Sequence, residues 1–263
     1  MPTFPEYDRP PVVETVLGVQ FARLPFTAAH VGWYWNKFLG LDEWRTAAET
    51  VRLEDVFERF GDERVWQLPG FRLTPPETTR IQITRADDQR MIQVQDTRFV
   101  YNWQRKEGAG YPTYRRLRPE FERYFDGFES FLRDAGLATS LSLNQWEVVY
   151  VNLIPIHTVW ERPDDLKRVF PGLYVPYAGF ETLTAQWSHQ LDKAAGRLYV
   201  EFQHVKARST GDESIKLQFT ARGPVPNADR AALFGGFELG HAAIVDAFNR
   251  MTSDDAQRYW GRQ

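Results

Sequence analysis

The sequence contains no cysteine. This absence excludes disulfides, a thiol nucleophile and a zinc site built from thiolates. No stretch of about 18 consecutive apolar residues occurs either, so a membrane-spanning helix is not expected. The first residues, MPTFPEYDRPP, lack the basic segment and apolar run of a signal peptide. We therefore expect a cytoplasmic protein that does not enter a membrane.

An excess of charge of one sign is also missing. The 263 residues include 32 lysine and arginine side chains and 35 aspartate and glutamate side chains, which gives a net charge of -3. Proteins that bind nucleic acids usually carry a basic surplus, so the balance disfavours nucleic acid as a partner without excluding it. Arginine outnumbers lysine 26 to 6. Arginine binds phosphate and carboxylate groups with two parallel hydrogen bonds, which lysine cannot do. Genomic base composition explains the same excess of arginine, however.

The familiar catalytic motifs are absent. The sequence has no GxSxG nucleophile elbow, no GxxxxGK[ST] loop, no GxGxxG after a strand and no HExxH. Glu238 and His241 have the ExxH spacing of di-iron proteins, but such a site needs the motif twice and two further carboxylates. From the sequence we assign no catalytic residue, no metal ligand and no cofactor.

Periodic apolar segments predict strands along the whole chain. Segment 12–22 alternates, with Val13, Leu17, Val19 and Phe21 mostly on one face, and this period of two is typical of a strand. The charged segment 41–63 has weak periodicity and is predicted as a loop with helical turns. Further strands are predicted at 64–68, 71–74, 79–85, 90–96, 98–105, 145–156, 184–191, 197–206 and 214–222.

Helical periodicity separates these strands. Thr27 is an expected N-cap for a helix that reaches about Leu39. A second long helix is predicted over about 227–250, with short helices near 162–170 and at the C-terminus. The first long helix ends at Gly136 and has an apolar stripe formed by Leu117, Phe121, Phe125, Phe128 and Leu132.

The order strand, helix, several strands, long helix occurs twice. We therefore predict an α+β protein of two similar halves, residues 1–137 and 138–263, each an antiparallel sheet curved around a long helix. This order resembles the helix-grip arrangement and, used twice, the TATA-binding-protein-like fold. The resemblance is one of element order, and a shared fold does not imply a shared function.

A second resemblance lies in the sequence itself. Its segments are PPVVETVLGVQF near the N-terminus, VVYVNLIPI in the middle and GHAAIVDAFNRMTSDDAQRYWG at the end. They resemble a sporadically distributed bacterial family of uncharacterised proteins of about this length. That family implies no activity, and no catalytic residue is carried over from it.

One face of the predicted sheet is polar. An antiparallel sheet with one face in water produces such alternation, and we expect this solvated face. An amide-rich surface for a peptide or a nucleic acid would have the same pattern. The polar positions of the first half are Arg80, Gln82, Thr84, Gln93, Gln95, Asn102 and Gln104.

A basic loop at the start of the first long helix is the candidate patch for an anion or a partner. Arginines in the first turns of a helix oppose the macrodipole, and a bound phosphate or an acidic partner would offset that cost. A solvated turn whose charges pair with Glu107, Glu120 and Glu122 explains the arginines as well. The patch consists of Arg105, Lys106, Tyr111, Tyr114, Arg115, Arg116 and Arg118.

Glu14 and Glu147 both lie in the opening strand of a half. We expect each to be structural and paired with an arginine on the polar face. If the opening strands are neighbours at the centre of one sheet, the two carboxyl groups could instead meet as acids in a cavity. Trp103, Phe125 and Phe128 are the candidates for lining a cavity between sheet and helix.

Together these patterns favour a non-enzymatic binding protein. Its sheet faces or the basic loop near Arg115 would contact a macromolecular partner. Two alternatives stay open, namely a small-molecule binder or enzyme with an aromatic cavity between sheet and helix, and a nucleic-acid binder across a saddle. The sequence identifies neither the partner nor the oligomeric state.

Overall fold

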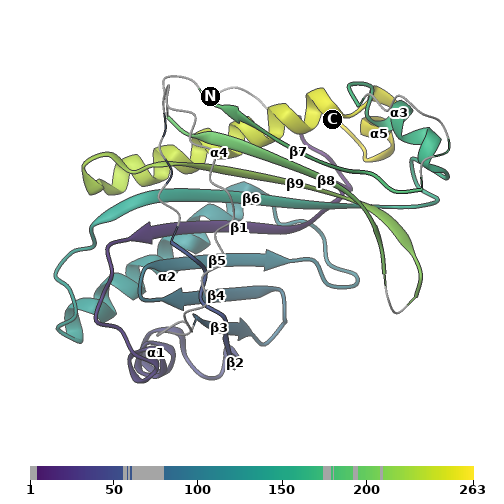
Figure 1. Ribbon diagram of the computed structural model, residues 1–263. Coiled ribbons are helices and arrows are strands. Elements are labelled where there is room, and N and C mark those ends of the chain that lie inside the picture. The colour runs from purple at the N-terminus through teal and green to yellow at the C-terminus, as the bar shows by residue number, and fades with distance from the viewer. Residues whose placement is uncertain are drawn as a thin grey trace.

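The computed structural model describes residues 5–55, 58, 60, 80–173, 179, 181–191, 195–207 and 210–263. Its main feature is a nine-stranded antiparallel sheet with the order β2-β3-β4-β5-β1-β6-β9-β8-β7 (Figure 1). The predicted strands 64–68 and 71–74 lie outside the described residues. The strands are β1 (Val12–Phe21), β2 (Trp44–Thr50), β3 (Arg80–Arg85), β4 (Arg90–Gln95), β5 (Arg98–Gln104), β6 (Leu143–Pro155), β7 (Thr184–Gln190), β8 (Arg197–Lys206) and β9 (Glu213–Pro224).

β1 and β6 are neighbours at the centre of this sheet. They pair antiparallel, with Gly18 opposite Glu147, while β5 flanks β1 and β9 flanks β6. Strands from before and after residue 137, the predicted boundary between the halves, therefore belong to one continuous sheet. The fold class is α+β, as the sequence predicts. After β1 the chain passes to the edge strand β2 and comes back through β3 and β4 to β5, beside β1. After β6 it passes to the opposite edge strand β7 and comes back through β8 to β9, beside β6.

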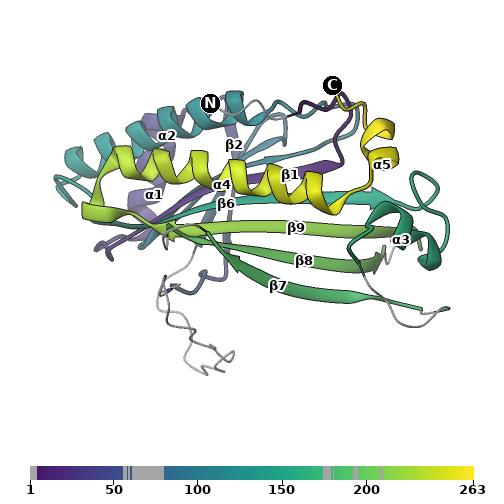
Figure 2. The same ribbon diagram turned by 90° about the horizontal axis from the view of Figure 1, so that it is seen from above.

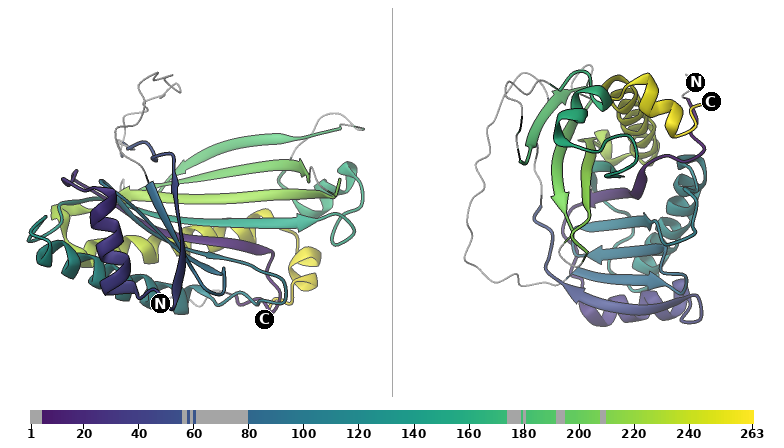
Figure 3. Two further views of the ribbon diagram at one scale, coloured as in Figure 1. Left: turned by 90° about the horizontal axis from the view of Figure 1, so that it is seen from below. Right: turned by 90° about the vertical axis from the view of Figure 1, so that its right-hand side faces the viewer.

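The two long helices lie side by side on one face of the sheet (Figure 2). Figure 3, right, shows the same arrangement along the strands, with the teal and yellow helices on one side. α2 buries the predicted apolar stripe, and Gly136 follows it with a φ of 67°. The helical elements are α1 (Ala28–Tyr34), the π-helical η1 (Trp35–Leu39), α2 (Tyr114–Asp134), η2 (Pro163–Asp165), α3 (Leu166–Val169), η4 (Pro226–Ala228), α4 (Arg230–Met251) and α5 (Asp254–Tyr259).

α4 is long and apolar enough to cross a membrane by length and composition alone. In this fold it packs against β6 and β9, and it buries Leu233, Phe237 and Ile244. A core helix shows this packing, because apolar residues on one face are covered by the sheet.

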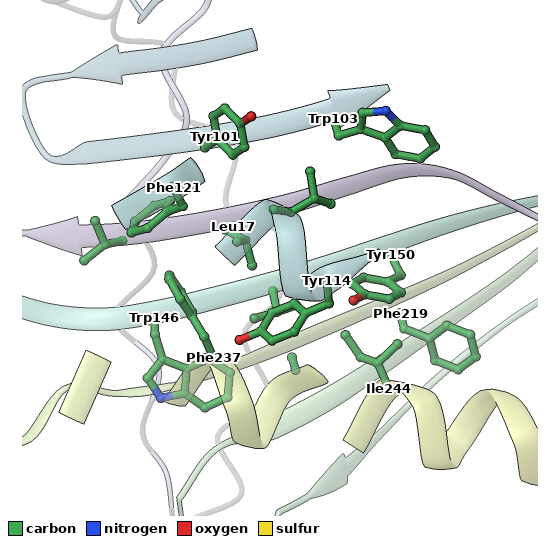
Figure 4. Close-up of a cluster of buried hydrophobic side chains, with 14 of the residues drawn as sticks. Leu17, Tyr101, Trp103, Tyr114, Phe121, Trp146, Tyr150, Phe219, Phe237 and Ile244 are labelled. Carbon is green, nitrogen blue, oxygen red and sulfur yellow. The ribbon is translucent and has the colours of Figure 1, made fainter. Parts of the chain in front are cut away.

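Aromatic side chains fill the space between the helices and the sheet (Figure 4). Phe99 of β5 lies with its ring centroid 5.1 Å from that of Phe128 and 5.5 Å from that of Phe125, both of α2. These three side chains have no exposed surface. The aromatic content of the sequence therefore belongs mainly to the core.

The opposite face of the sheet is less wet than the sequence predicts. Gln93, Gln95 and Asn102 are buried rather than solvated. The side chain of Gln95 bonds to the backbone N–H and carbonyl of Leu53, whereas Gln93 donates to Asn102, which in turn donates to Glu14. The prediction of one solvated face is wrong at these three positions, because an earlier segment of the chain and neighbouring side chains of the sheet satisfy the buried amides.

The sequence prediction also missed β2. Segment 41–63 is expected as a loop with helical turns, but Trp44–Thr50 is an edge strand paired with β3. Only Trp44 of this strand is buried, and the next five residues are exposed. An edge strand exposed on both faces has no apolar alternation to reveal it.

Candidate functional site

A pocket of about 190 Å³ lies between β1, β6, the first turn of α2 and α4. The N-terminal segment before β1 forms another of its walls. This segment is held by the C-terminus, since the backbone N–H of Asp8 donates to the carbonyl of Gly261. The described residues that line it are Pro5, Glu6, Tyr7, Pro10, Pro11, Val12, Tyr111, Thr113, Tyr114, Arg115, Tyr150, Asn152, His241, Ile244, Val245 and Phe248.

Helical spacing explains the wall that α4 contributes. His241, Ile244, Val245 and Phe248 are three or four residues apart, which brings their side chains onto one face of the helix. Three of the four are apolar. Tyr150 enters from β6 and is buried on the helix side of the sheet, beside Tyr114 and Ile244 in Figure 4. The pocket therefore has apolar walls with a few polar groups among them.

Two tyrosines and a histidine form a hydrogen-bonded chain in the pocket. The hydroxyl of Tyr111 donates to that of Tyr150 across 3.2 Å, and the Tyr150 hydroxyl lies 2.8 Å from Nδ1 of His241. In the neutral tautomer that carries its proton on Nε2, Nδ1 accepts and the Tyr150 hydroxyl donates, which leaves the Tyr150 oxygen free to accept from Tyr111. The chain then runs from Tyr111 through Tyr150 to His241.

Tyr114, the first residue of α2, packs against the same histidine of α4. Its ring stacks on His241 with centroids 4.1 Å apart and planes 9° apart, and its hydroxyl donates to Oε1 of Glu238 at 3.0 Å. Glu238 and His241 are thus two points of attachment for one tyrosine. Their ExxH spacing has a packing role, and no group of three metal-ligating side chains occurs in the described part of the chain.

Burial keeps the tyrosines and the histidine in the pocket neutral. It raises the pKa of Tyr150 well above its ordinary value and also raises that of Tyr111. Burial, together with the positive charge of Arg115, lowers the pKa of His241 to about 4. Neither the hydroxyls nor the imidazole has a pKa near neutrality, which is where general acid–base catalysis needs it.

His241 should titrate with a midpoint near pH 4 when it is followed by NMR. Replacing Arg115 by glutamine should raise this midpoint, because the charge of Arg115 disfavours the imidazolium. The folded pKa lies below the unfolded value of about 6.5, so the unfolded chain binds the extra proton. His241 therefore makes stability fall as the pH drops from about 6.5 to 4. A midpoint of 6 or above would contradict the buried, neutral imidazole.

The predicted basic patch is divided in the structure. Tyr111, Tyr114 and Arg115 line the pocket, whereas Lys106 and Arg116 point to solvent. Arg115 is 3.8 Å from Glu6, and its side chain is 84% exposed. The patch is therefore the rim of a pocket rather than a continuous basic surface.

Two arginines of the predicted patch have partners within the fold. The side chain of Arg105 donates to the carbonyl of Pro10 at 2.8 Å. Arg118 bonds to Glu122 at 3.0 Å and lies over the ring of Phe234 at 4.5 Å. Of the three expected glutamate partners, Glu122 is confirmed for Arg118, whereas Glu120 bonds to Arg90 instead.

The predicted aromatic cavity residues fill the core instead of lining the pocket. Phe125 and Phe128 pack among the rings of α2 and β5. Trp103 is fully buried, and its ring centroid is 5.3 Å from that of Tyr111. It therefore packs against a residue that lines the pocket without lining the pocket itself. The pocket lies along the same sheet–helix interface, farther toward α4.

Glu14 and Glu147 do not meet. They lie on one face of neighbouring strands, but Glu147 is opposite Gly18, four residues from Glu14, which separates them by about 13 Å along the strand. Glu14 accepts from the amide of Asn102 at 2.8 Å and from that of Gln104 at 3.2 Å. Among the described residues Glu14 has these amides of the neighbouring strand β5 as partners, and the expected arginine is not found there.

Glu147 has the arginine partner that the sequence predicts. Its carboxylate bonds to Nε of Arg222 on the adjacent strand β9. Burial by itself would raise the pKa of Glu147, but the guanidinium groups of Arg222 and Arg98 lower it below its ordinary value. Glu147 is thus ionised and structural.

Glu147→Gln should destabilise the protein by about 1–2 kcal/mol at neutral pH, since it leaves Arg222 without its counter-charge. Glu14→Gln is the matched control and should cost less than about 1 kcal/mol, because amide partners can bond to a glutamine. Urea unfolding measures both. The folded pKa of Glu147 is depressed, so its contribution is lost as the pH falls through that pKa. If the two variants lose the same free energy of unfolding at neutral pH, the ion pair between Glu147 and Arg222 does not have the stabilising role described here.

No protein-family model matches this sequence, and no curated protein matches it. The similarity to a bacterial family therefore stays a prediction. Sequence reasoning missed Tyr150 and the apolar residues of α4 as pocket residues. They come from segments about 90 residues apart, and only the pairing of β6 with β1 brings them next to Tyr111.

Proposed function

We propose that the protein binds a small, mainly apolar molecule in the pocket between the sheet and its two long helices. A hydrogen-bonding group of that molecule would meet the chain of Tyr111, Tyr150 and His241. The observation that carries this proposal is the pocket itself, with apolar walls and a few convergent polar groups. Ligand sites in proteins are commonly built in this way.

The volume suits a ligand of about one ring. An apolar cavity of about 150 Å³ in another protein holds benzene, and this pocket measures about 190 Å³. Tyr114 and Phe248 offer aromatic surface at its walls, and the prolines of the N-terminal segment offer rigid apolar surface. A ring can therefore be covered on several sides at little cost in side-chain entropy.

The protonation states favour binding over acid–base chemistry. The depressed pKa of His241 and the raised pKa of Tyr150 leave both groups neutral across the physiological range. They can orient a ligand through hydrogen bonds without exchanging a proton with it.

A macromolecular partner at the sheet face or the basic loop is supported less well. Residues 52–55 cover polar side chains of the first-half sheet, and Arg105 and Arg118 bond within the chain. A nucleic acid bound across a saddle lacks the basic surface that it requires, given the overall balance of charge.

For the architecture, we propose two related halves, residues 1–137 and 138–263, in a helix-grip arrangement like that of the TATA-binding-protein-like fold. The strand order supports this, because β1 and β6 form the centre and one long helix from each half covers the same face. Duplication would produce such an arrangement about an axis between β1 and β6. A bacterial origin and a cytoplasmic location remain part of the same proposal.

The test of the proposed function is an isothermal titration with phenylacetamide, a neutral molecule with one ring and one amide. We expect saturable binding of one molecule per chain. Its ring can contact the apolar walls while its amide N–H donates to a polar oxygen that lines the pocket. Heats equal to those of dilution up to the solubility limit would count against a pocket for ring-sized molecules.

A further inference from the structure

We propose that the natural ligand of this pocket carries a carboxylate, which Arg115 binds at the mouth while the apolar part of the ligand enters between α4 and β6. This inference rests on the proposed function and names the chemical class of its ligand. Arg115 is the only cationic side chain among the described residues that line the pocket.

Arg115 is available for a ligand, unlike its neighbour Arg118. Its side chain is 84% exposed, and its partner Glu6 is 3.8 Å away and 70% exposed. Two exposed charges at this separation gain little from each other in water. By contrast, Arg118 bonds to Glu122 and packs on an aromatic ring. Arg115 can therefore exchange Glu6 for a carboxylate of the ligand at small cost.

The start of α2 is a second feature at the mouth that favours an anion. Thr113, the N-cap residue, makes no side-chain cap bond, and the first turn contains no acidic residue. The macrodipole of a long helix favours an anion at this end. Arg115 and Arg116 follow directly, so a carboxylate would relieve the unfavourable placement of arginine that the sequence shows.

The polar groups deeper in the pocket do not compete for that charge. Burial holds Tyr150 in its neutral form, and His241 is neutral at pH 7. Glu238 bonds to the hydroxyl of Tyr114 and lies 3.8 Å from Arg118. The carboxylate is therefore expected at the mouth, and the ring in the neutral interior, where no charge must be desolvated.

The test compares phenylacetate with its neutral isostere phenylacetamide at pH 7 and low salt. We expect phenylacetate to bind about fivefold more tightly, since an exposed ion pair contributes modestly. Arg115→Gln should abolish this preference. Arg116→Gln is the matched control and should retain it, because Arg116 does not line the pocket. Glu6→Gln should strengthen phenylacetate binding, since it removes the competing carboxylate.

The outcomes separate this inference from the proposed function. Equal affinities for the two probes in the wild-type protein would overturn the carboxylate but leave the pocket in place. Phenethylamine, a third probe with one ring and a positive charge, tests the sign of the charge. If it binds more tightly than phenylacetate, the proposed carboxylate is overturned, and Glu6 becomes the residue expected to bind the charged group of the ligand. Binding of none of the three probes would overturn the proposed function and this inference together. An undiminished preference in Arg115→Gln would show that another group binds the anion.

Discussion

Replacing Gly236 by alanine is expected to destabilise the protein by about 3 kcal/mol, the upper range for an overpacked core. A Cβ at this position of α4 would lie 2.3 Å from Cδ1 of Trp146, which is closer than real atoms approach. Trp146 belongs to β6 and is only 1% exposed, so its ring has no space to withdraw. Figure 4 shows this ring between β6 and α4.

Three other glycines also lie against the ring of Trp146. A Cβ at Gly223 would lie 2.4 Å from the same ring, at Gly240 2.8 Å and at Gly196 3.1 Å. The absence of side chains at these positions allows α4 to approach the sheet closely enough to form the pocket wall. The close approach of α4 therefore depends on Gly236.

The control for this substitution is the preceding residue on the same helix. A Cβ at Gly235 would meet no atom within 4 Å. Gly235→Ala should therefore stabilise the protein, by up to about 1 kcal/mol, through helix propensity alone. Urea unfolding of both variants measures the contrast. Similar free energies of unfolding for the two variants would contradict the packing described for Trp146.

Val245→Trp should weaken phenylacetamide binding at least tenfold, which is about 1.4 kcal/mol of binding free energy. Val245 lines the pocket and is half-buried, so a larger side chain there can occupy the space of the ring. The fold should persist, because the pocket accepts the added atoms without displacing the core. Binding is measured by isothermal titration and folding by thermal unfolding.

Asp246→Trp provides the matched control for this variant. Asp246 is the next residue on α4, is exposed and does not line the pocket. The same side chain is thus introduced outside the site, and affinity should stay within about twofold of the wild type. If both variants bind as the wild type does, the ligand lies elsewhere. If both lose binding, the effect belongs to α4 as a whole and not to the pocket.

Much of the fold could be predicted from the sequence, because buried periodicity is a strong signal. The alternation of β1 and the apolar stripe of α2 are confirmed, as are the strands that become β4, β5, β8 and β9. β2 could not be predicted in this way, since an exposed edge strand has no buried face. The cover over Gln95 could not be predicted either, because Leu53 contacts it through backbone atoms.

The sequence predicts only part of the candidate site. The density of arginine indicates Tyr111, Tyr114 and Arg115 as part of a patch for an anion or a partner, and the structure places all three at the pocket. Charge is the only signal of function that these residues give in the sequence. The partners that change this interpretation, Tyr150 and His241, are set by strand pairing and helix packing, which local sequence does not encode.

The central claim is that a ring-sized molecule binds between α4, β6 and the start of α2. Backbone NMR shifts of isotopically labelled protein during a titration with phenylacetamide test it most directly. We predict saturating shifts that concentrate at residues 111–115, 150–152 and 241–248, with little change at β3 or β7. The absence of saturating shifts, or saturating shifts confined to residues outside these segments, would contradict the claim.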